Sequence, residues 1–133
     1  MKRIFLLLLL AISPFLSFAQ QKLSAEEKKL VERIDKNYQE TVALLEEVVN
    51  INSGSLNLEG VREVGRVFER EFQKIGFQTE WVEVPAEVKR AGHFVATRTG
   101  TKGKKLFLIG HLDTVFEKDM PFTPFTWLND STA

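Results

Sequence analysis

The feature that most constrains the fold of this 133-residue chain is an unbroken run of four apolar residues, Leu106-Phe107-Leu108-Ile109. A turn with two glycines, Gly100 to Lys104, precedes the run, and a short polar motif follows it. Strands that are apolar at every position are buried on both faces, which is typical of the sheets of α/β proteins. The sequence therefore predicts an α/β fold in which residues 106–109 form an inner strand.

Two amphipathic helices are predicted before this strand. The first begins at Ser24-Ala25-Glu26-Glu27, which has the form of a capping box, and its pattern runs to about Asn50. Its apolar residues recur every three or four positions and form a stripe that must face a core or a partner: Leu30, Ile34, Tyr38, Val42, Leu45 and Val49. After turn residues 52–55, a second stripe predicts a helix that stops at Gly76: Val61, Val64, Phe68, Phe72 and Ile75.

Between the second helix and the apolar run, the hydrophobic period changes from that of a helix to that of a strand. Alternation and aromatic or β-branched content predict one strand from Phe77 to Pro85 and a second from His93 to Thr99. Together with residues 106–109, these segments predict a hairpin followed by a buried strand.

The buried strand ends in Gly110-His111-Leu112-Asp113-Thr114-Val115. In open α/β sheets, ligands bind at the carboxyl ends of strands, where side chains emerge from a rigid edge. The period of a strand places His111 and Asp113 on the same side, about 6.6 Å apart along the chain. An aspartate in that place accepts a hydrogen bond from the ring N–H that faces away from a metal. The motif therefore favours His111 as a metal ligand and Asp113 as its partner.

An isolated H-x-D pattern also has an ordinary structural interpretation. His111 would then cap the end of the strand, and Asp113 would be a turn residue. Other polar residues are interpreted as having no role in the site. His93 is interpreted as a surface or core histidine, and Glu117, Asp119 and Asp130 as exposed loop residues. The two tryptophans, Trp81 and Trp127, are interpreted as packing residues, although the position of Trp127 would also suit an approach to the site.

The N-terminus, MKRIFLLLLLAISPFLSFAQ, has two cations, an apolar stretch and small residues at Ser17 and Ala19. This pattern predicts a secretory signal peptide over residues 1–19, cleaved after Ala19, and a periplasmic or secreted protein. An uncleaved membrane anchor is disfavoured because Pro14 interrupts a stretch too short to span a bilayer. Equal numbers of cationic and anionic residues, 18 of each, argue against nucleic-acid binding. With no cysteine, any metal site must use His, Asp and Glu.

From about Leu44 to Phe122, the chain resembles the N-terminal part of the catalytic domain of M20 metallopeptidases, the group with glutamate carboxypeptidases of the G2 type and related aminoacylases. The resemblance lies in the helix and turn from Leu44 to Ser55, in the helix from Gly60 to Phe77, and above all in the apolar strand that runs into G-H-x-D-T-V. The first two segments are weakly specific, whereas the strand and its motif are strongly so.

This resemblance implies a mixed-sheet hydrolase with two zinc ions, in which His111 is a zinc ligand and the catalytic residue Asp113 orients it. It implies a peptide or N-acyl amino acid as substrate and a homodimer formed through an inserted domain. Cleavage of the signal peptide, in turn, predicts no membrane association of the mature protein. The family's bridging aspartate, Glu-Glu pair, further acidic ligand and late histidine lie downstream of the segment that residues 44–122 resemble.

Residues 20–133 are therefore expected to be an incomplete catalytic domain that is inactive alone and belongs to a zinc-dependent exopeptidase. A catalytic zinc needs about three protein ligands, which one histidine cannot supply. The alternative is a non-catalytic secreted remnant or scaffold module with the same fold. These two hypotheses differ in whether an acidic, glycine-rich coding sequence continues beyond Ala133.

Overall fold

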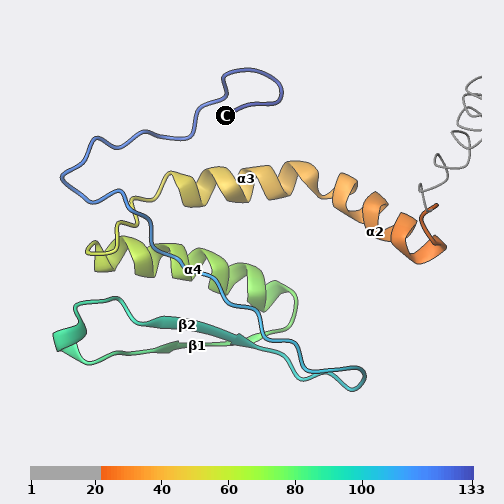
Figure 1. Ribbon diagram of the computed structural model, residues 1–133, viewed down its shortest axis with the longest axis horizontal. Helices are drawn as coiled ribbons and strands as arrows, with labels where there is room; N and C mark the ends of the chain where they lie inside the picture. Colours follow the sequence, from red (N-terminus) through yellow and green to blue (C-terminus); the bar gives the residue numbers. More distant parts are fainter. Residues whose placement is uncertain (1–21) are drawn as a thin grey trace, which may run out of the picture. The chain divides into compact units, whose positions relative to one another are not determined.

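The computed structural model describes residues 22–133, which form two units divided after Glu40. The elements are, in chain order, α2 (Ala25–Lys36), α3 (Tyr38–Val49), α4 (Leu58–Lys74), β1 (Gln78–Val82), a short 3-10 helix (Ala86–Val88) and β2 (His93–Thr97) (Figure 1). The predicted signal peptide, residues 1–19, lies outside the described residues. Among the residues that are described, no helix is long and apolar enough to cross a bilayer.

Helix α2 begins with the predicted capping box. The Glu27 backbone N–H donates to the Ser24 hydroxyl at 3.2 Å, and the Ser24 backbone N–H donates to the Glu27 carboxylate at 2.7 Å. The predicted single helix to Asn50 is wrong, because α2 ends at Lys36 and Asn37 leaves the helical conformation. Asparagine favours such a break because its side chain competes with the backbone for hydrogen bonds.

The predicted apolar stripe of the first helical segment is only partly correct. Leu30 and Ile34 of α2 are 59% and 60% exposed. In α3, Val42 is half-buried, but Leu45 and Val49 are exposed and the neighbouring Leu44 and Val48 are half-buried instead. The break at Asn37 interrupts the helix, so the single helical period on which the predicted stripe depends does not hold over residues 24–50.

Helix α4 supplies most of the small core. Asn57 caps its N-terminus by accepting a hydrogen bond from the Gly60 N–H, and its buried face contains Val61, Val64 and Val67. The predicted stop at Gly76 is confirmed, since this residue has a positive φ of 81°. Its N–H donates to the Gln73 carbonyl, and the Phe77 N–H donates to the Phe72 carbonyl.

Ile75 was predicted on the buried face of this helix, and that prediction is wrong. The side chain is 56% exposed because Ile75 is the C-cap residue, where the backbone departs from the helix. The Phe72 and Phe77 rings, 5.1 Å apart, instead make the apolar contact that accompanies this type of helix end.

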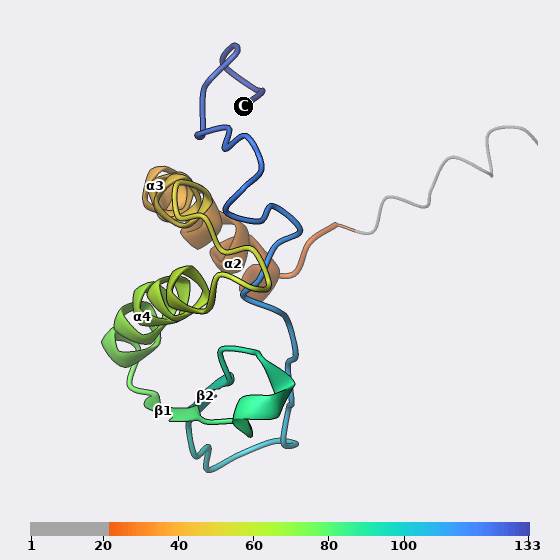
Figure 2. The same cartoon turned by 90° about the vertical axis from the view of Figure 1, so that its left-hand side faces the viewer.

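Strands β1 and β2 form an antiparallel hairpin in which Trp81 lies opposite Phe94. The predicted strands to Pro85 and Thr99 are both too long, since β1 ends at Val82 and β2 at Thr97. Helix α4 packs on the hairpin (Figure 2). The Trp81 indole lies so close to Gly65 that a methyl group there would strike the ring, and its Nε1–H donates to the Ala91 carbonyl at 2.7 Å. This confirms the packing role predicted for Trp81.

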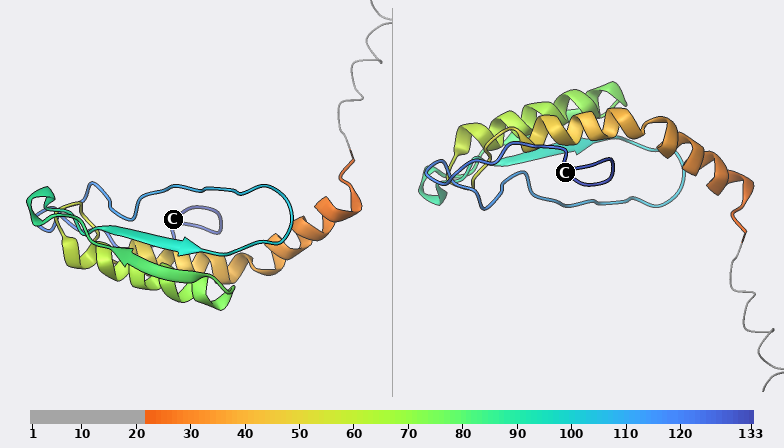
Figure 3. Two further views of the ribbon diagram at one scale, coloured as in Figure 1. Left: turned by 90° about the horizontal axis from the view of Figure 1, so that it is seen from below. Right: turned by 90° about the horizontal axis from the view of Figure 1, so that it is seen from above.

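The run Leu106–Ile109 is not an inner strand among the described residues, which corrects the central fold prediction. It follows the hairpin as a plain extended trace (Figure 3), and its four side chains are 80–87% exposed. A strand buried on both faces needs a paired neighbour and a covering layer on each side. Here β1 and β2 pair only with each other, so the described fold is a small α/β unit with a two-stranded antiparallel sheet.

Candidate metal-ligand site at His111 and Asp113

The site is built where two segments far apart in the sequence meet. The turn at residues 53–55 and the segment at residues 113–114 form a short parallel bridge between Gly54 and Thr114. The Thr114 N–H donates to the Ser53 carbonyl at 2.8 Å, and the Ser55 N–H donates to the Thr114 carbonyl at 3.2 Å. This backbone pairing fixes the position of residues 111–114 although they belong to no regular strand.

Gly54 permits the close approach of the two segments. A methyl group at this position would collide with the Phe116 carbonyl oxygen and with the backbone of Glu117. The Glu117 carboxylate then accepts hydrogen bonds from the Leu56 N–H at 3.1 and 3.2 Å. The prediction that Glu117 is an exposed loop residue is only partly correct. Glu117 lies in a loop, but its side chain is half-buried and ties its own segment to the 53–56 turn.

The other side of the turn is fixed to the start of α4. The Asn57 side-chain amide donates to the Asn52 carbonyl at 2.6 Å, while its oxygen caps the helix at Gly60. Gly60 is packed against the same Asn52 carbonyl, which leaves no space for a side chain. Helix α4 thus fixes the turn at residues 52–55. This turn fixes the segment with the H-x-D motif.

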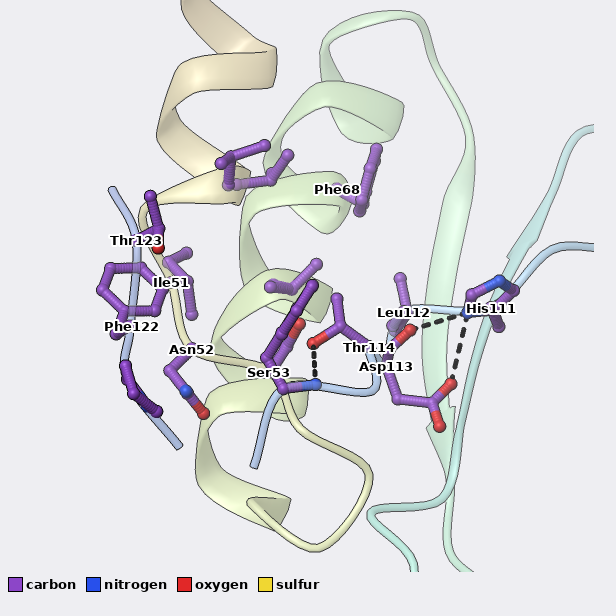
Figure 4. A pocket seen from close by; sticks show the side chains of 15 residues that line it. Ile51, Asn52, Ser53, Phe68, His111, Leu112, Asp113, Thr114, Phe122 and Thr123 are labelled. Carbon is purple, nitrogen blue, oxygen red and sulfur yellow. Dashed lines mark hydrogen bonds and ion pairs between the residues drawn. The ribbon is translucent and has the colours of Figure 1, made fainter. Parts of the chain in front are cut away.

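His111 and Asp113 lie side by side, as Figure 4 shows. The His111 Nδ1 is 2.7 Å from the Asp113 backbone carbonyl oxygen and 3.4 Å from the carboxylate oxygen Oδ1. Because a carbonyl oxygen only accepts, this contact requires the proton to be on Nδ1. In the neutral ring, the lone pair is then on Nε2, and the side chain is 82% exposed.

The Asp113 carboxylate has a second partner that sequence reasoning missed. Its other oxygen, Oδ2, accepts a hydrogen bond from the Ser55 hydroxyl at 2.5 Å. This bond is the main reason why the pKa of Asp113 is lowered, and the nearby His111 ring contributes less. The signal for Ser55 was present in the turn sequence Asn52 to Ser55, but nothing local pairs that turn with a residue 58 positions away.

A cavity of about 420 Å³ lies next to this pair (Figure 4). His111 and Asp113 line it together with mostly apolar side chains from α3, α4 and the C-terminal segment, among them Val48, Phe68 and Phe122. Trp127, which was predicted to suit an approach to the site, does not line the cavity and instead packs edge-on against Phe125. The cavity is therefore lined by the polar His111–Asp113 pair on one part of its surface and mainly by apolar side chains on the rest.

The order of contacts limits the chemistry that these residues can perform. In a serine hydrolase, the histidine lies between the serine and the aspartate. Here Asp113 lies between Ser55 and His111, so the histidine is not placed to activate the serine hydroxyl. What the arrangement offers is an imidazole whose Nδ1 is held and whose Nε2 is available to a metal or a proton.

The other polar residues considered in the sequence do not join this pair. Asp119 and Asp130 are exposed, as predicted, and His93 is exposed too, which leaves the surface alternative of its two interpretations. Within residues 22–133, no group of three or more His, Asp and Glu side chains is arranged to hold a metal ion. The described residues therefore supply one candidate ligand, whereas a catalytic zinc needs about three.

The chain is similar to carboxypeptidase G2 of Pseudomonas sp. (strain RS-16), with 34% identity over 77 residues. The match covers 58% of this chain and 18% of the relative, so the chain spans a small part of the length of the curated protein that it matches. No protein-family model matches the chain, and no solved structure matches it significantly. The similarity is consistent with a hydrolase of the peptidase class and does not establish a family.

Proposed function

We propose that this chain is part of a zinc-dependent hydrolase of peptide or amide bonds, of the M20 metallopeptidase type. The observation that carries the proposal is the geometry of His111, whose Nδ1 contacts Asp113 and whose Nε2 is left for a metal. Metal-binding histidines commonly donate their second ring N–H to a carbonyl or a carboxylate. The similarity to a carboxypeptidase over 77 residues supports the same class.

In this proposal, His111 is a zinc ligand and Asp113 is the catalytic residue that fixes its ring. The described residues do not complete a zinc site, because they offer one suitably placed nitrogen where about three ligands are needed. The other ligands, expected for two zinc ions, have to come from other parts of the protein. Residues 20–133 alone should accordingly bind zinc weakly and hydrolyse nothing.

The substrate that fits this class is a peptide or an N-acyl amino acid with a free carboxylate beside the scissile bond. Periplasmic or secreted location and a homodimer are part of the same proposal. A retained Met1 in protein from the native host, seen by intact mass spectrometry, would contradict the export part, which rests on the sequence of residues 1–19.

The function is tested with a chimera in which residues 44–122 of this chain, which contain the H-x-D motif, replace the corresponding segment of carboxypeptidase G2. We expect the chimera to hydrolyse a peptide with a free C-terminal carboxylate. The His111→Ala variant removes the ligand and should abolish turnover. The Asp113→Asn variant keeps the shape but loses the carboxylate, and should lower kcat/KM by about 10- to 100-fold.

The matched control is His93→Ala, which removes the other histidine of the chain from the exposed start of β2. This variant should retain the activity of the chimera. A folded chimera that hydrolyses nothing would favour a non-catalytic module. Equal activity of the His111→Ala and His93→Ala variants would show that the H-x-D motif is structural.

A further inference from the structure

Ser55 is the only described side chain besides His111 whose hydrogen bond reaches the Asp113 carboxylate. Its hydroxyl donates to Oδ2, while Oδ1 faces the His111 ring. The two oxygens of one carboxylate are thereby divided between a half-buried serine and an exposed histidine. A carboxylate held at one oxygen cannot rotate without breaking that bond, so the position of the other oxygen is fixed as well.

The support for the His111 ring comes from one side only. Its side chain is 82% exposed, and its polar contacts are those of Nδ1 with the carbonyl and the carboxylate of Asp113. An exposed side chain with few contacts changes rotamer readily. The orientation of the ring therefore depends on Asp113 alone, through its backbone carbonyl at 2.7 Å and through its carboxylate at 3.4 Å.

Ser55 itself is held by the backbone. Its N–H donates to the Thr114 carbonyl, one residue beyond Asp113, and the Thr114 N–H donates to the Ser53 carbonyl. These backbone bonds set the Ser55 hydroxyl opposite Asp113, and the hydroxyl adds one longer contact of 3.4 Å to the Thr114 carbonyl. Removing the hydroxyl leaves both backbone bonds in place, so the bridge between the two segments should persist.

We propose that Ser55 is a positioning residue for the candidate site: its hydroxyl fixes the Asp113 carboxylate, which together with the Asp113 backbone carbonyl holds the His111 ring with the proton on Nδ1 and the lone pair on Nε2. We call the chain of contacts from Ser55 through Asp113 to His111 the relay. The relevance of this relay to catalysis rests on the proposed function. The relay itself concerns the tautomer and orientation of one histidine, which are measurable without metal or substrate.

The test uses residues 20–133 labelled with ¹⁵N at histidine, without metal, at about pH 8.5, where an ordinary imidazole is neutral. The ¹⁵N shifts of the two ring nitrogens report the ratio of the Nδ1–H to the Nε2–H form. We expect the Nδ1–H form of His111 to dominate in the unaltered chain. Ser55→Ala should lower the ratio by about two- to tenfold, which corresponds to one hydrogen bond.

Three further variants separate positioning from a general loss of structure. Ser55→Thr keeps a hydroxyl and should restore the ratio, and Ser55→Cys, with its weak S–H donor, should give an intermediate value. Ser131→Ala removes a hydroxyl that bonds only to Asn129 and should change nothing. Amide exchange at Ser55 and Thr114 monitors the backbone bridge and should be the same in all variants.

The proposal is overturned if Ser55→Ala leaves the His111 ratio unchanged, if Ser55→Thr fails to restore it, or if the Ser55 and Thr114 amides lose protection together with the ratio. The last result would make Ser55 a structural residue of the turn. If Ser55→Ala does not fold, Ser55→Cys is judged by the same criteria. None of these outcomes depends on hydrolysis by the chimera, so a failure of this relay and a failure of the proposed function are distinguishable.

Discussion

At the scale of single residues, two glycines near the H-x-D motif have opposite surroundings. Gly54 has the Phe116 carbonyl and the Glu117 backbone where its Cβ would be, whereas Gly110 has no atom within 4 Å of that position. Backbone atoms cannot move aside for an added methyl group as easily as the end of a flexible side chain can. The contact between the 53–55 turn and the 113–117 segment therefore requires glycine at position 54 but not at position 110.

The first prediction follows from this difference. Gly54→Ala should lower the free energy of unfolding by about 1–3 kcal/mol, because the methyl group forces the two segments apart. Gly110→Ala, the matched control, should change it by less than about 0.5 kcal/mol. Urea denaturation of the two variants checks both values. Equal stabilities would mean that the close contact at Gly54 is absent in solution.

Single residues also show where sequence reasoning succeeded and where it failed. His111 and Asp113 were placed together from the spacing of a strand, and the structure brings them together in a segment that is not a strand. The sequence predicts only a turn at Ser55, because the pairing of this residue with Asp113 spans 58 positions of sequence. Long-range contacts of this kind depend on the tertiary fold, which local patterns do not encode.

At the scale of elements, the features that the sequence predicted well are those set by local interactions. The capping box at Ser24 and the stop at Gly76 are formed by residues three to five positions apart, and both are confirmed. The sequence does not predict the helix break at Asn37 or the ends of β1 and β2. At these positions the local sequence favours no one residue over its neighbours as the end of the element. The prediction of an inner strand at residues 106–109 is wrong for a different reason, because such a strand requires paired neighbours elsewhere in the chain.

The capping box at the start of α2 gives a prediction about pH. The pKa of Glu27 is lowered. The main cause is the hydrogen bond from the Ser24 backbone N–H, and the hydrogen bond with the Ser24 side chain contributes less. A lowered pKa means that the ionised carboxylate stabilises the helix above the ordinary glutamate pKa, and that this contribution is lost as the pH falls through the lowered value. Helicity of residues 25–36 should therefore decrease on acidification to about pH 2.

Ser24→Ala tests this account of α2. Loss of the cap should destabilise the helix by about 1 kcal/mol at neutral pH and should weaken the effect of acidification at Glu27. Ser24→Asp keeps an N-cap acceptor and serves as the control. Cα chemical shifts of residues 25–36 provide the measurement. A helix that is equally populated in the Ser24→Ala variant would mean that the box seen in the structure contributes no stability.

At the scale of the whole molecule, the most prominent surface feature is the exposed run Leu106–Ile109. Unpaired backbone groups and four consecutive apolar side chains form a ready template for strand pairing with another chain. Burial of one phenylalanine contributes about 1.5–3 kcal/mol. Residues 20–133 should therefore self-associate, and Phe107→Lys should weaken the association by at least about tenfold.

Sedimentation velocity over a series of protein concentrations measures this association. The control is Leu128→Lys, which places the same cation at a residue that is 74% exposed outside the run. This control should leave the association unchanged. A monomer at all concentrations would show that residues 106–109 are covered in solution. Equal weakening by both variants would assign the association to another surface.

The central claim is that His111 is a metal ligand, and the most direct measurement is the zinc content of the folded chimera after dialysis, determined by mass spectrometry. The account predicts that His93→Ala retains the zinc of the unaltered chimera and that His111→Ala loses most of it, because one ligand of a set of about three is removed. The same zinc content in both variants would contradict the claim and leave the His111–Asp113 pair as a structural contact.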